Sequence, residues 1–511
     1  MLKKRLTSDI ALLIYIAIAA SAGHLAVAGN YGFFLDELYT IACSQHLSLA
    51  FVDIPPVAPA LLALNTLVFG DSLFALHILP SLFSGAVVVL TGLMARELGG
   101  GKFAVVFAGV AAAFVPVWMA VGSLYTYDFL DQLVIVSLFY ALLRLIKREN
   151  PKTWLWIGGI AGFGLMVKPS MVFFIAALVI GLLLTQHRRA FKTRWPWLGA
   201  LIGFVIILPA LIWQISNSFP VAEYWGAYAT GKTVNAGPAE FILMQVVGMN
   251  PFLLPVWVTG LIYVLLNKEG KKYRLLGVIF AVLFAVFLTT GAKMYMLIPA
   301  YSVLLAAGAL SIERFAAKLW KKALMIAYAC VIVLTGLVMA PNFMPVLPVD
   351  SLITYYDTMG GLVGAKSIRL DNGARVELPQ YFYDRFEWDV LVADVAEVYK
   401  SLPEEERADT AVVSQNYGWA GAVDKLGSAY GLPNAMCGQL NYYFFSLDDI
   451  GKPTWIMIGE DQQSLEAVFG SVTLAKVSET VYRQPHKTPI YICREPKFTP
   501  EEGAVGIKKF Q

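Results

Sequence analysis

The sequence predicts a polytopic α-helical membrane protein with a smaller soluble α/β domain at its C-terminal end. The composition is one reason: 58% of the 511 residues are hydrophobic and 15% are charged, whereas about 25% of a typical soluble domain is charged. A series of apolar segments of about 20 residues, long enough to cross a bilayer, is the second reason. The charge distribution is the third, because residues 1–343 hold 24 Lys and Arg against 13 Asp and Glu, and residues 344–511 hold 15 against 23. We therefore expect a basic transmembrane domain at 1–343 and an acidic domain at 344–511.

Eleven segments of the transmembrane domain have the length and hydropathy of spanning helices. They are 8–28, 76–95, 103–122, 129–146, 154–167, 169–186, 196–215, 240–266, 275–291, 294–312 and 323–343. The first could instead be a cleaved signal peptide, but its apolar run is longer than the usual h-region of about 7–15 residues.

Basic residues fall in every second connection between these spans. Six alternate segments, beginning with the N-terminus, hold 21 Lys and Arg, and the intervening connections hold three. Positive charge marks the cytoplasmic side of membrane proteins. We therefore expect a cytoplasmic N-terminus, an extracytoplasmic C-terminal domain and residence in the cell inner (plasma) membrane. The net charge of +3 gives no reason to expect a nucleic-acid partner.

The first outer loop, residues 29–75, places two adjacent carboxylates, Asp36 and Glu37, among aromatic residues. Segments 36–50 and 56–69 have the apolar spacing of amphipathic helices, which would lie in the membrane interface. Asp36 could simply cap the first of these helices, with Glu37 favouring the first turn through the helix dipole. The alternative is that the pair is catalytic.

A second acidic group joins the third and fourth expected spans. It consists of Tyr127, Asp128 and Asp131. Carboxylates at or inside a membrane edge are costly and usually functional. Asp128 could cap the following helix, whereas Asp131 lies one turn further in and is harder to explain as a cap.

Three lysines break the charge pattern because they lie on the expected outer side. Lys168 lies between spans five and six, Lys293 lies between spans nine and ten beside Tyr295, and Lys232 lies in the loop 216–239. Ammonium groups placed there would neutralise an anion such as phosphate; alternatively, they extend to lipid headgroups. Acids and cations on one face fit the transfer of a group from a lipid phosphate.

An ordered set of these residues resembles glycosyltransferase family 39, the group of GT-C membrane enzymes that includes protein O-mannosyltransferases and, more distantly, lipid A aminoarabinose transferases. The tail segments 416–422 and 430–433 resemble those of the bacterial members. The residues that carry the resemblance are Asp36-Glu37, Asp53 with Pro55-Pro56, Asp128, Lys168-Pro169, and Lys293 with Tyr295 and Pro299-Ala300-Tyr301.

The resemblance implies a GT-C fold and a polyprenyl-phosphate sugar as donor, bound from the outer side. Asp36 matches the family's acidic catalytic residue and Glu37 its neighbour in the pair, while Lys168 and Lys293 match positions near the donor phosphate. Asp128 matches a second acidic position. One departure is Ile54, which stands where aminoarabinose transferases have a lysine and argues against that specificity.

The expected reaction is an inverting displacement at the anomeric carbon, in which Asp36 takes the proton of the acceptor hydroxyl. Lys168, Lys293, Asp128, Tyr295 and Tyr127 form the expected donor site. No cofactor is required, although Asp36 and Asp128 could hold a divalent cation. The acceptor could be a lipid, a glycan or a protein. Alternatives are a transporter or flippase of a lipid-linked sugar, a diphosphate-donor oligosaccharyltransferase, or a membrane scaffold whose soluble tail does the binding.

The tail has the pattern of an α/β fold, with strands expected at 410–415, 454–459 and 489–494, a helix at 418–430 and a charged surface turn at 403–408. Its aromatic residues are more often core than sugar-stacking. They include Trp419, Tyr442, Tyr443, Phe444 and Phe445. Cys437 and Cys493 could form a disulfide or remain free thiols, and Cys43 and Cys330 stand alone.

Overall fold

A computed structural model of the chain describes residues 7–230, 237–315, 319–359, 378–483 and 485–510. The chain forms two compact units, unit 1 with residues 1–30, 74–211 and 234–367, and unit 2 with residues 31–73, 212–233 and 368–511. The first outer loop thus groups with the C-terminal residues. Where the transmembrane domain itself ends stays a prediction. The N-terminal basic residues 3–5, Lys232 and Lys318 lie outside the described residues.

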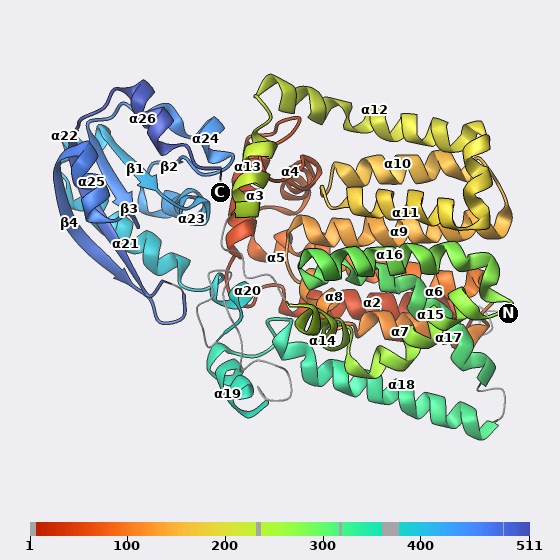
Figure 1. Cartoon of the computed structure of the whole chain (residues 1–511). Helices are drawn as coiled ribbons and strands as arrows, with labels where there is room; N and C mark the ends of the chain where they lie inside the picture. Colours follow the sequence, from red (N-terminus) through yellow and green to blue (C-terminus); the bar gives the residue numbers. More distant parts are fainter. Residues whose placement is uncertain (1–6, 231–236, 316–318, 360–377, 484, 511) are drawn as a thin grey trace. The chain divides into compact units, whose positions relative to one another are not determined.

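Unit 1 is a bundle of apolar helices, several of which run side by side in Figure 1, such as α9, α10, α11 and α16. Its α-helices are α2 (Asp9–Val27), α5 (Leu73–Leu76), α6 (Ile78–Glu97), α7 (Lys102–Ala113), α8 (Pro116–Val121), α9 (Tyr127–Arg148), α10 (Thr153–Leu165), α11 (Met171–Leu184), α12 (Arg194–Ser216), α14 (Pro238–Gly248), α15 (Leu254–Leu266), α16 (Arg274–Thr290), α17 (Tyr301–Phe315), α18 (Leu319–Met339) and α19 (Val349–Met359). Short 3-10 turns join them at Gln186–Lys192, Pro251–Leu253, Gly270–Tyr273, Met294–Met296, Ile298–Ala300 and Ala340–Asn342.

The predicted polytopic helical fold is confirmed, but the count of eleven spans is not. Within the described residues, seven helices are long and apolar enough to cross a membrane, or nine if two bent pairs each count as one. The expected span 240–266 is one such pair, bent by 88° where Pro251 follows Asn250. The expected span 103–122 divides before Pro116, which has no N–H for a continuous helix. The fifth expected span, 154–167, forms a helix of 13 residues, which is shorter than the helices counted as spans.

Glycines allow α10 and α12 to approach closely. A Cβ atom at Gly158 would lie 1.9 Å from the carbonyl oxygen of Gly199, and one at Gly162 would lie 2.6 Å from the Cα of Gly203. Small residues four apart on each helix are typical of helix pairs in membranes, where van der Waals packing replaces the hydrophobic effect as the driving force.

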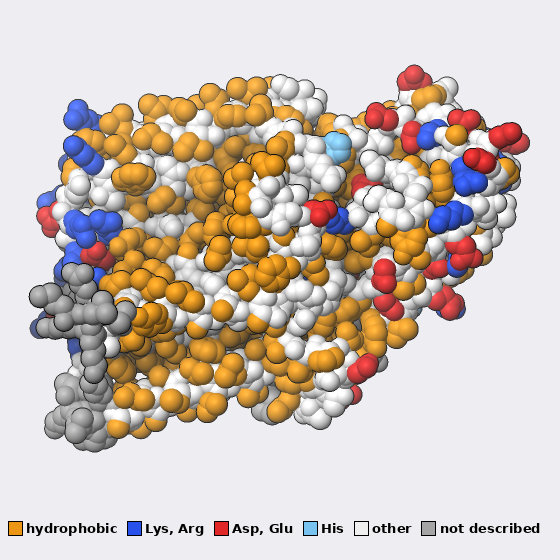
Figure 2. Space-filling view, turned by 180° about the vertical axis from the view of Figure 1, so that it is seen from behind, with side chains coloured by type: hydrophobic (Ala, Val, Ile, Leu, Met, Phe, Trp, Pro, Cys, Tyr) orange, Lys and Arg blue, Asp and Glu red, His pale blue; other side chains and the backbone are white. Residues whose placement is uncertain are grey.

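Polar contacts join the predicted cytoplasmic segments at one end of unit 1. The ion pairs are Asp9–Arg96 (3.4 Å), Glu97–Lys147 (3.2 Å), Glu97–Arg148 (2.9 Å) and Glu269–Arg314 (2.5 Å). Figure 2 shows Lys and Arg side chains gathered at one edge of a broad apolar surface. Alternate connections therefore meet at one end, as the charge pattern predicts; which side of the membrane they face stays a prediction.

Unit 2 contains a five-stranded sheet of order β2-β1-β3-β5-β4, in which β1 runs parallel to β2 and β3, while β5 runs antiparallel to β3 and β4. The strands are β1 (Thr410–Ser414), β2 (Ala435–Cys437), β3 (Thr454–Ile458), β4 (Phe469–Glu479) and β5 (Lys487–Pro496). The helices are α3 (Leu35–Gln45), α4 (Val57–Phe69), α13 (Pro220–Thr230), α20 (Gln380–Tyr383), α21 (Trp388–Ser401), α22 (Glu404–Ala408), α23 (Tyr417–Leu426), α24 (Tyr442–Phe445), α25 (Gln462–Val468) and α26 (Pro500–Ile507), with 3-10 turns at Gly427–Tyr430 and Leu447–Asp449.

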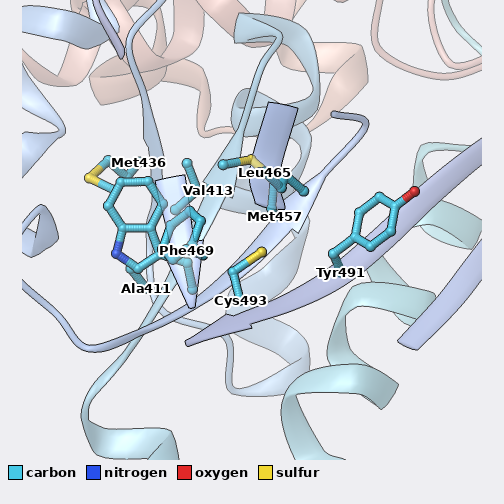
Figure 3. Packing of buried hydrophobic residues seen from close by; sticks show 9 residues of the cluster. Ala411, Val413, Met436, Met457, Leu465, Phe469, Tyr491 and Cys493 are labelled. Atoms are coloured by element: carbon cyan, nitrogen blue, oxygen red, sulfur yellow. The ribbon is translucent and has the colours of Figure 1, made fainter. Parts of the chain in front are cut away.

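The three predicted strands and the predicted helix of the tail are present, and β2 and β4 are additional. Side chains on one face of the sheet, including Val413, Met457 and Cys493, pack into a buried core that Figure 3 shows from close by. All four cysteines are free thiols. Two strands separate Cys437 on β2 from Cys493 on β5, so their Cα atoms are about 14 Å apart at the usual strand spacing, too far for a disulfide.

Candidate active site

A buried ammonium group lies at the end of unit 1 opposite the basic edge. Lys168, in the turn between α10 and α11, has 6% of its surface exposed. Its Nζ donates to Asp128 Oδ1 at 2.5 Å and lies 5.2 Å and 4.7 Å from the ring centres of Tyr127 and Tyr295. The structure thus brings together four of the five residues predicted to bind the donor.

The start of α9 positions the carboxylate of this cluster. Thr126 is the N-cap residue, and its hydroxyl accepts from the backbone N–H of Asp128 at 3.3 Å. The suggestion that Asp128 caps the helix is therefore wrong. Asp128 instead lies in the first turn and faces Lys168.

Burial and counter-charge act in opposite directions on Lys168. Burial alone lowers the pKa of the amine. The carboxylates of Asp128 and Asp131 and the phenol of Tyr295 raise it by more than burial lowers it, so the pKa lies above its usual value. Asp131 is 4% exposed, and its Oδ1 has no hydrogen-bond partner among the described residues. Lys168 is therefore a buried cation between two acids and does not extend to lipid headgroups. Lys293 is exposed in the turn after α16.

The acidic pair of the first outer loop lies in unit 2. Helix α3 begins at Leu35 after the N-cap residue Phe34, so the suggestion that Asp36 is the cap is also wrong. Glu37 is fully buried, and its Oε2 accepts from the backbone N–H of Phe34 at 2.8 Å. Glu37 thus secures the start of the helix, and its catalytic role stays a prediction. Asp36 is partly exposed, and its Oδ1 accepts from the hydroxyl of Tyr417 at 2.8 Å.

A third carboxylate of this loop, Asp53, forms hydrogen bonds with residues that sequence reasoning missed. The hydroxyl of Tyr39 donates to Asp53 Oδ1 at 2.6 Å, and the amide of Asn441 donates to the same oxygen at 3.2 Å. Burial raises the pKa of Asp53 to about 7, although the bond from Tyr39 partly offsets this. Tyr39 could have been suspected because it lies three residues after Asp36 on the same helix face. Nothing in the sequence pattern links either residue to Asn441.

The described residues contain no group of three or more His, Cys, Asp or Glu side chains that could hold a metal ion. Asp36 lies in unit 2 and Asp128 in unit 1. The divalent cation suggested for these two residues stays a prediction.

Comparison with known proteins supports the resemblance. Residues 53–213 match the family described as dolichyl-phosphate-mannose-protein mannosyltransferase. The crystal structures of ArnT from Cupriavidus metallidurans, in the apo state and bound to undecaprenyl phosphate, share the fold with TM-scores of 0.61 and 0.63 and 13% identity, over 94% of this chain and 97% of ArnT. The chain thus has the GT-C fold of these structures, and the family match covers residues 53–213.

Curated relatives match the chain over a shorter stretch than the solved structures do. An undecaprenyl phosphate-α-4-amino-4-deoxy-L-arabinose arabinosyl transferase from Pseudomonas savastanoi pv. phaseolicola is 25% identical over 184 residues, which are 35% of this chain and 34% of that relative. A second such transferase, from Pseudomonas fluorescens, is 23% identical over 189 residues. The aligned part thus spans about a third of the relatives' length.

Breaking the Lys168–Asp128 ion pair is predicted to lower the stability of the protein. Lys168→Met leaves the buried Asp131 and the partly exposed Asp128 without their cation, and breaking a buried pair from one side costs up to about 3–5 kcal/mol. We expect a lower melting temperature for the purified protein in detergent. Lys168→Met combined with Asp128→Asn removes both charges of the ion pair and should recover part of the loss, because Asp131 remains. A single variant as stable as the wild type would contradict the burial of this pair.

The raised pKa of Asp53 predicts that the stability of the folded state depends on pH. An unfolded aspartate has a pKa of about 4, so between pH 4 and 7 the folded state binds more protons than the unfolded state. The stability of the folded state should therefore fall as pH rises through this range and level off above it. Melting temperatures of wild type and Asp53→Asn across this range test the effect. The variant should show a flatter profile, and parallel profiles would exclude Asp53 as the source.

Proposed function

We propose that the protein is a membrane glycosyltransferase that moves a sugar from a polyprenyl-phosphate donor to an acceptor hydroxyl, with inversion at the anomeric carbon. The observation that carries the proposal is the buried Lys168 cation, which lies beside the rings of Tyr127 and Tyr295 in a chain with the GT-C fold. The curated relatives are named for an undecaprenyl-phosphate donor, which supports the same donor class here.

The Lys168 cluster has the chemistry of a phosphate site. Its ammonium is held by Asp128, so a donor phosphate that approaches would exchange with this carboxylate and remain next to the same cation. A phosphate leaving group that stays paired with a cation departs without an acid, because its developing charge is already stabilised. Lys293, exposed in the turn beside Tyr295, supplies a second positive charge in this proposal.

Asp36 is the proposed general base. It is partly exposed, whereas Glu37 is fully buried and occupied at the start of α3. An acceptor hydroxyl that attacks the sugar must lose its proton, and a carboxylate in hydrogen-bond reach can take it. A divalent cation stays an optional addition to the phosphate site.

The sugar and the acceptor form the finer part of the proposal. The curated relatives are named as transferases of a pentose, but Ile54 stands where the aminoarabinose transferases have a lysine, so a different sugar is favoured here. Incubation of the purified protein with radiolabelled polyprenyl-phosphate pentoses and hexoses, each with lipid, glycan or peptide acceptors, would identify both substrates.

The transporter alternative receives less support. A transport site is expected near the bilayer midplane. Asp128 instead lies in the first turn of the 22-residue helix α9, whose last turn contains Lys147 and Arg148 at the basic edge.

Asp36→Asn tests the proposed base. The asparagine oxygen can still accept from Tyr417, so the melting temperature and donor binding should stay close to wild type. Loss of a general base should lower turnover by about 10²–10⁴-fold. Asp71→Asn is a matched control, because Asp71 belongs to the same outer loop, is exposed and pairs with Lys425. Near-normal turnover of Asp36→Asn would exclude it as the base.

A further inference from the structure

The carboxylate of Asp36 is held by a side chain that lies far away in the sequence. Tyr417 begins α23, and its hydroxyl donates to Asp36 Oδ1 at 2.8 Å. The ring of Tyr417 also packs on that of Tyr39, with 4.8 Å between the ring centres. A residue of the C-terminal segment is thus in direct contact with the proposed base.

The packing of α23 on α3 fixes where this hydroxyl lies. Asn416 caps α23 by accepting from the backbone N–H of Gly418 at 2.8 Å. A Cβ atom at Gly418 would lie 2.4 Å from Leu35 Cγ, and one at Gly421 would lie 2.9 Å from Leu38 Cβ. The two glycines therefore allow the helices to touch, which leaves the phenol little freedom to move away from Asp36.

A second contact holds the same helix from the same C-terminal segment. The side-chain amide of Asn441 donates to the hydroxyl of Tyr39 and to Asp53 Oδ1. Its carbonyl oxygen accepts from the backbone N–H of Val52 at 2.8 Å. Helix α3, which carries Asp36, is therefore hydrogen-bonded to the C-terminal segment at two residues, Asp36 and Tyr39.

We infer that Tyr417 is a positioning residue for the transfer reaction, which orients the Asp36 carboxylate and favours its ionised, proton-accepting form. This inference rests on the proposed role of Asp36 as the general base. A hydrogen bond to one carboxylate oxygen fixes the rotation of the group, and a donor hydroxyl favours the charged state.

The charged surroundings are consistent with Tyr417 remaining a donor. Burial, followed by the nearby charge of Asp36, raises the pKa of the Tyr417 phenol well above its ordinary value, with smaller contributions from Asp53 and Asp384. The hydroxyl therefore keeps its proton at physiological pH. Further titratable groups nearby are Glu37, which follows Asp36 in the chain, and Tyr39, whose ring packs on that of Tyr417.

Tyr417→Phe tests the inference, because it removes the hydroxyl and keeps the ring. We expect kcat to fall about ten- to a hundred-fold, as for loss of a hydrogen bond to a charged group, with little change in the KM for the donor. The acidic limb of the pH profile of kcat should move to higher pH. Tyr417→His, which keeps a ring and an N–H donor, should recover part of the rate.

Tyr442→Phe is the matched control. Its hydroxyl also donates to a partly exposed carboxylate of unit 2, Asp424 Oδ2, at 2.7 Å. The control therefore loses a comparable part-buried hydrogen bond, and its pH profile and kcat should stay close to wild type. A purely structural role for Tyr417 predicts that both tyrosine variants lose stability to a similar extent and neither shifts the pH profile.

The double variant Asp36→Asn with Tyr417→Phe isolates the coupling. If Tyr417 acts through Asp36, the double variant turns over at the same rate as Asp36→Asn alone. A further drop of the size seen in Tyr417→Phe, or an unchanged pH profile in that single variant, would overturn the inference. Absence of transfer by the wild type would instead refute the proposed function.

Discussion

The constraint on which the membrane unit depends is the neutralisation of one buried positive charge. An ammonium group enclosed by apolar helices costs several kcal/mol unless an acid compensates it. Asp128, placed by the Thr126 cap at the start of α9, supplies that acid. The turn between α10 and α11 and the turn before α17 meet at the same point, because each contributes to the surroundings of Lys168. In the proposed reaction, the donor phosphate would take the place of the Asp128 carboxylate beside this ammonium group.

Unit 2 meets a different requirement, because it fixes the position of the Asp36 carboxylate within the loop 31–73. Residues 31–73 belong to the same compact unit as the C-terminal segment. Trp388 donates to the carbonyl of Phe33 at 2.8 Å, and Arg385 donates to that of Gly32 at 3.1 Å. These bonds secure the chain just before α3. The C-terminal segment therefore acts as the support for the first outer loop.

Part of this architecture could be predicted from the sequence. Runs of apolar residues and alternating positive charge located most of the spans, and motif order located Asp36, Asp128 and Lys168. Local patterns could not show that Lys168 and Asp128, 40 residues apart, form an ion pair. They also could not reveal Tyr417, because its partner lies 381 residues away. The span count failed where Pro116 and Pro251 interrupt apolar runs, since hydropathy does not register a missing N–H.

The most direct test of the account is a structure of the purified protein with undecaprenyl phosphate, determined by cryo-electron microscopy. The account predicts phosphate oxygens about 3 Å from Lys168 Nζ, with the Asp128 carboxylate displaced from its present contact. A phosphate bound at the basic edge of unit 1, with the Lys168–Asp128 pair intact, would contradict it.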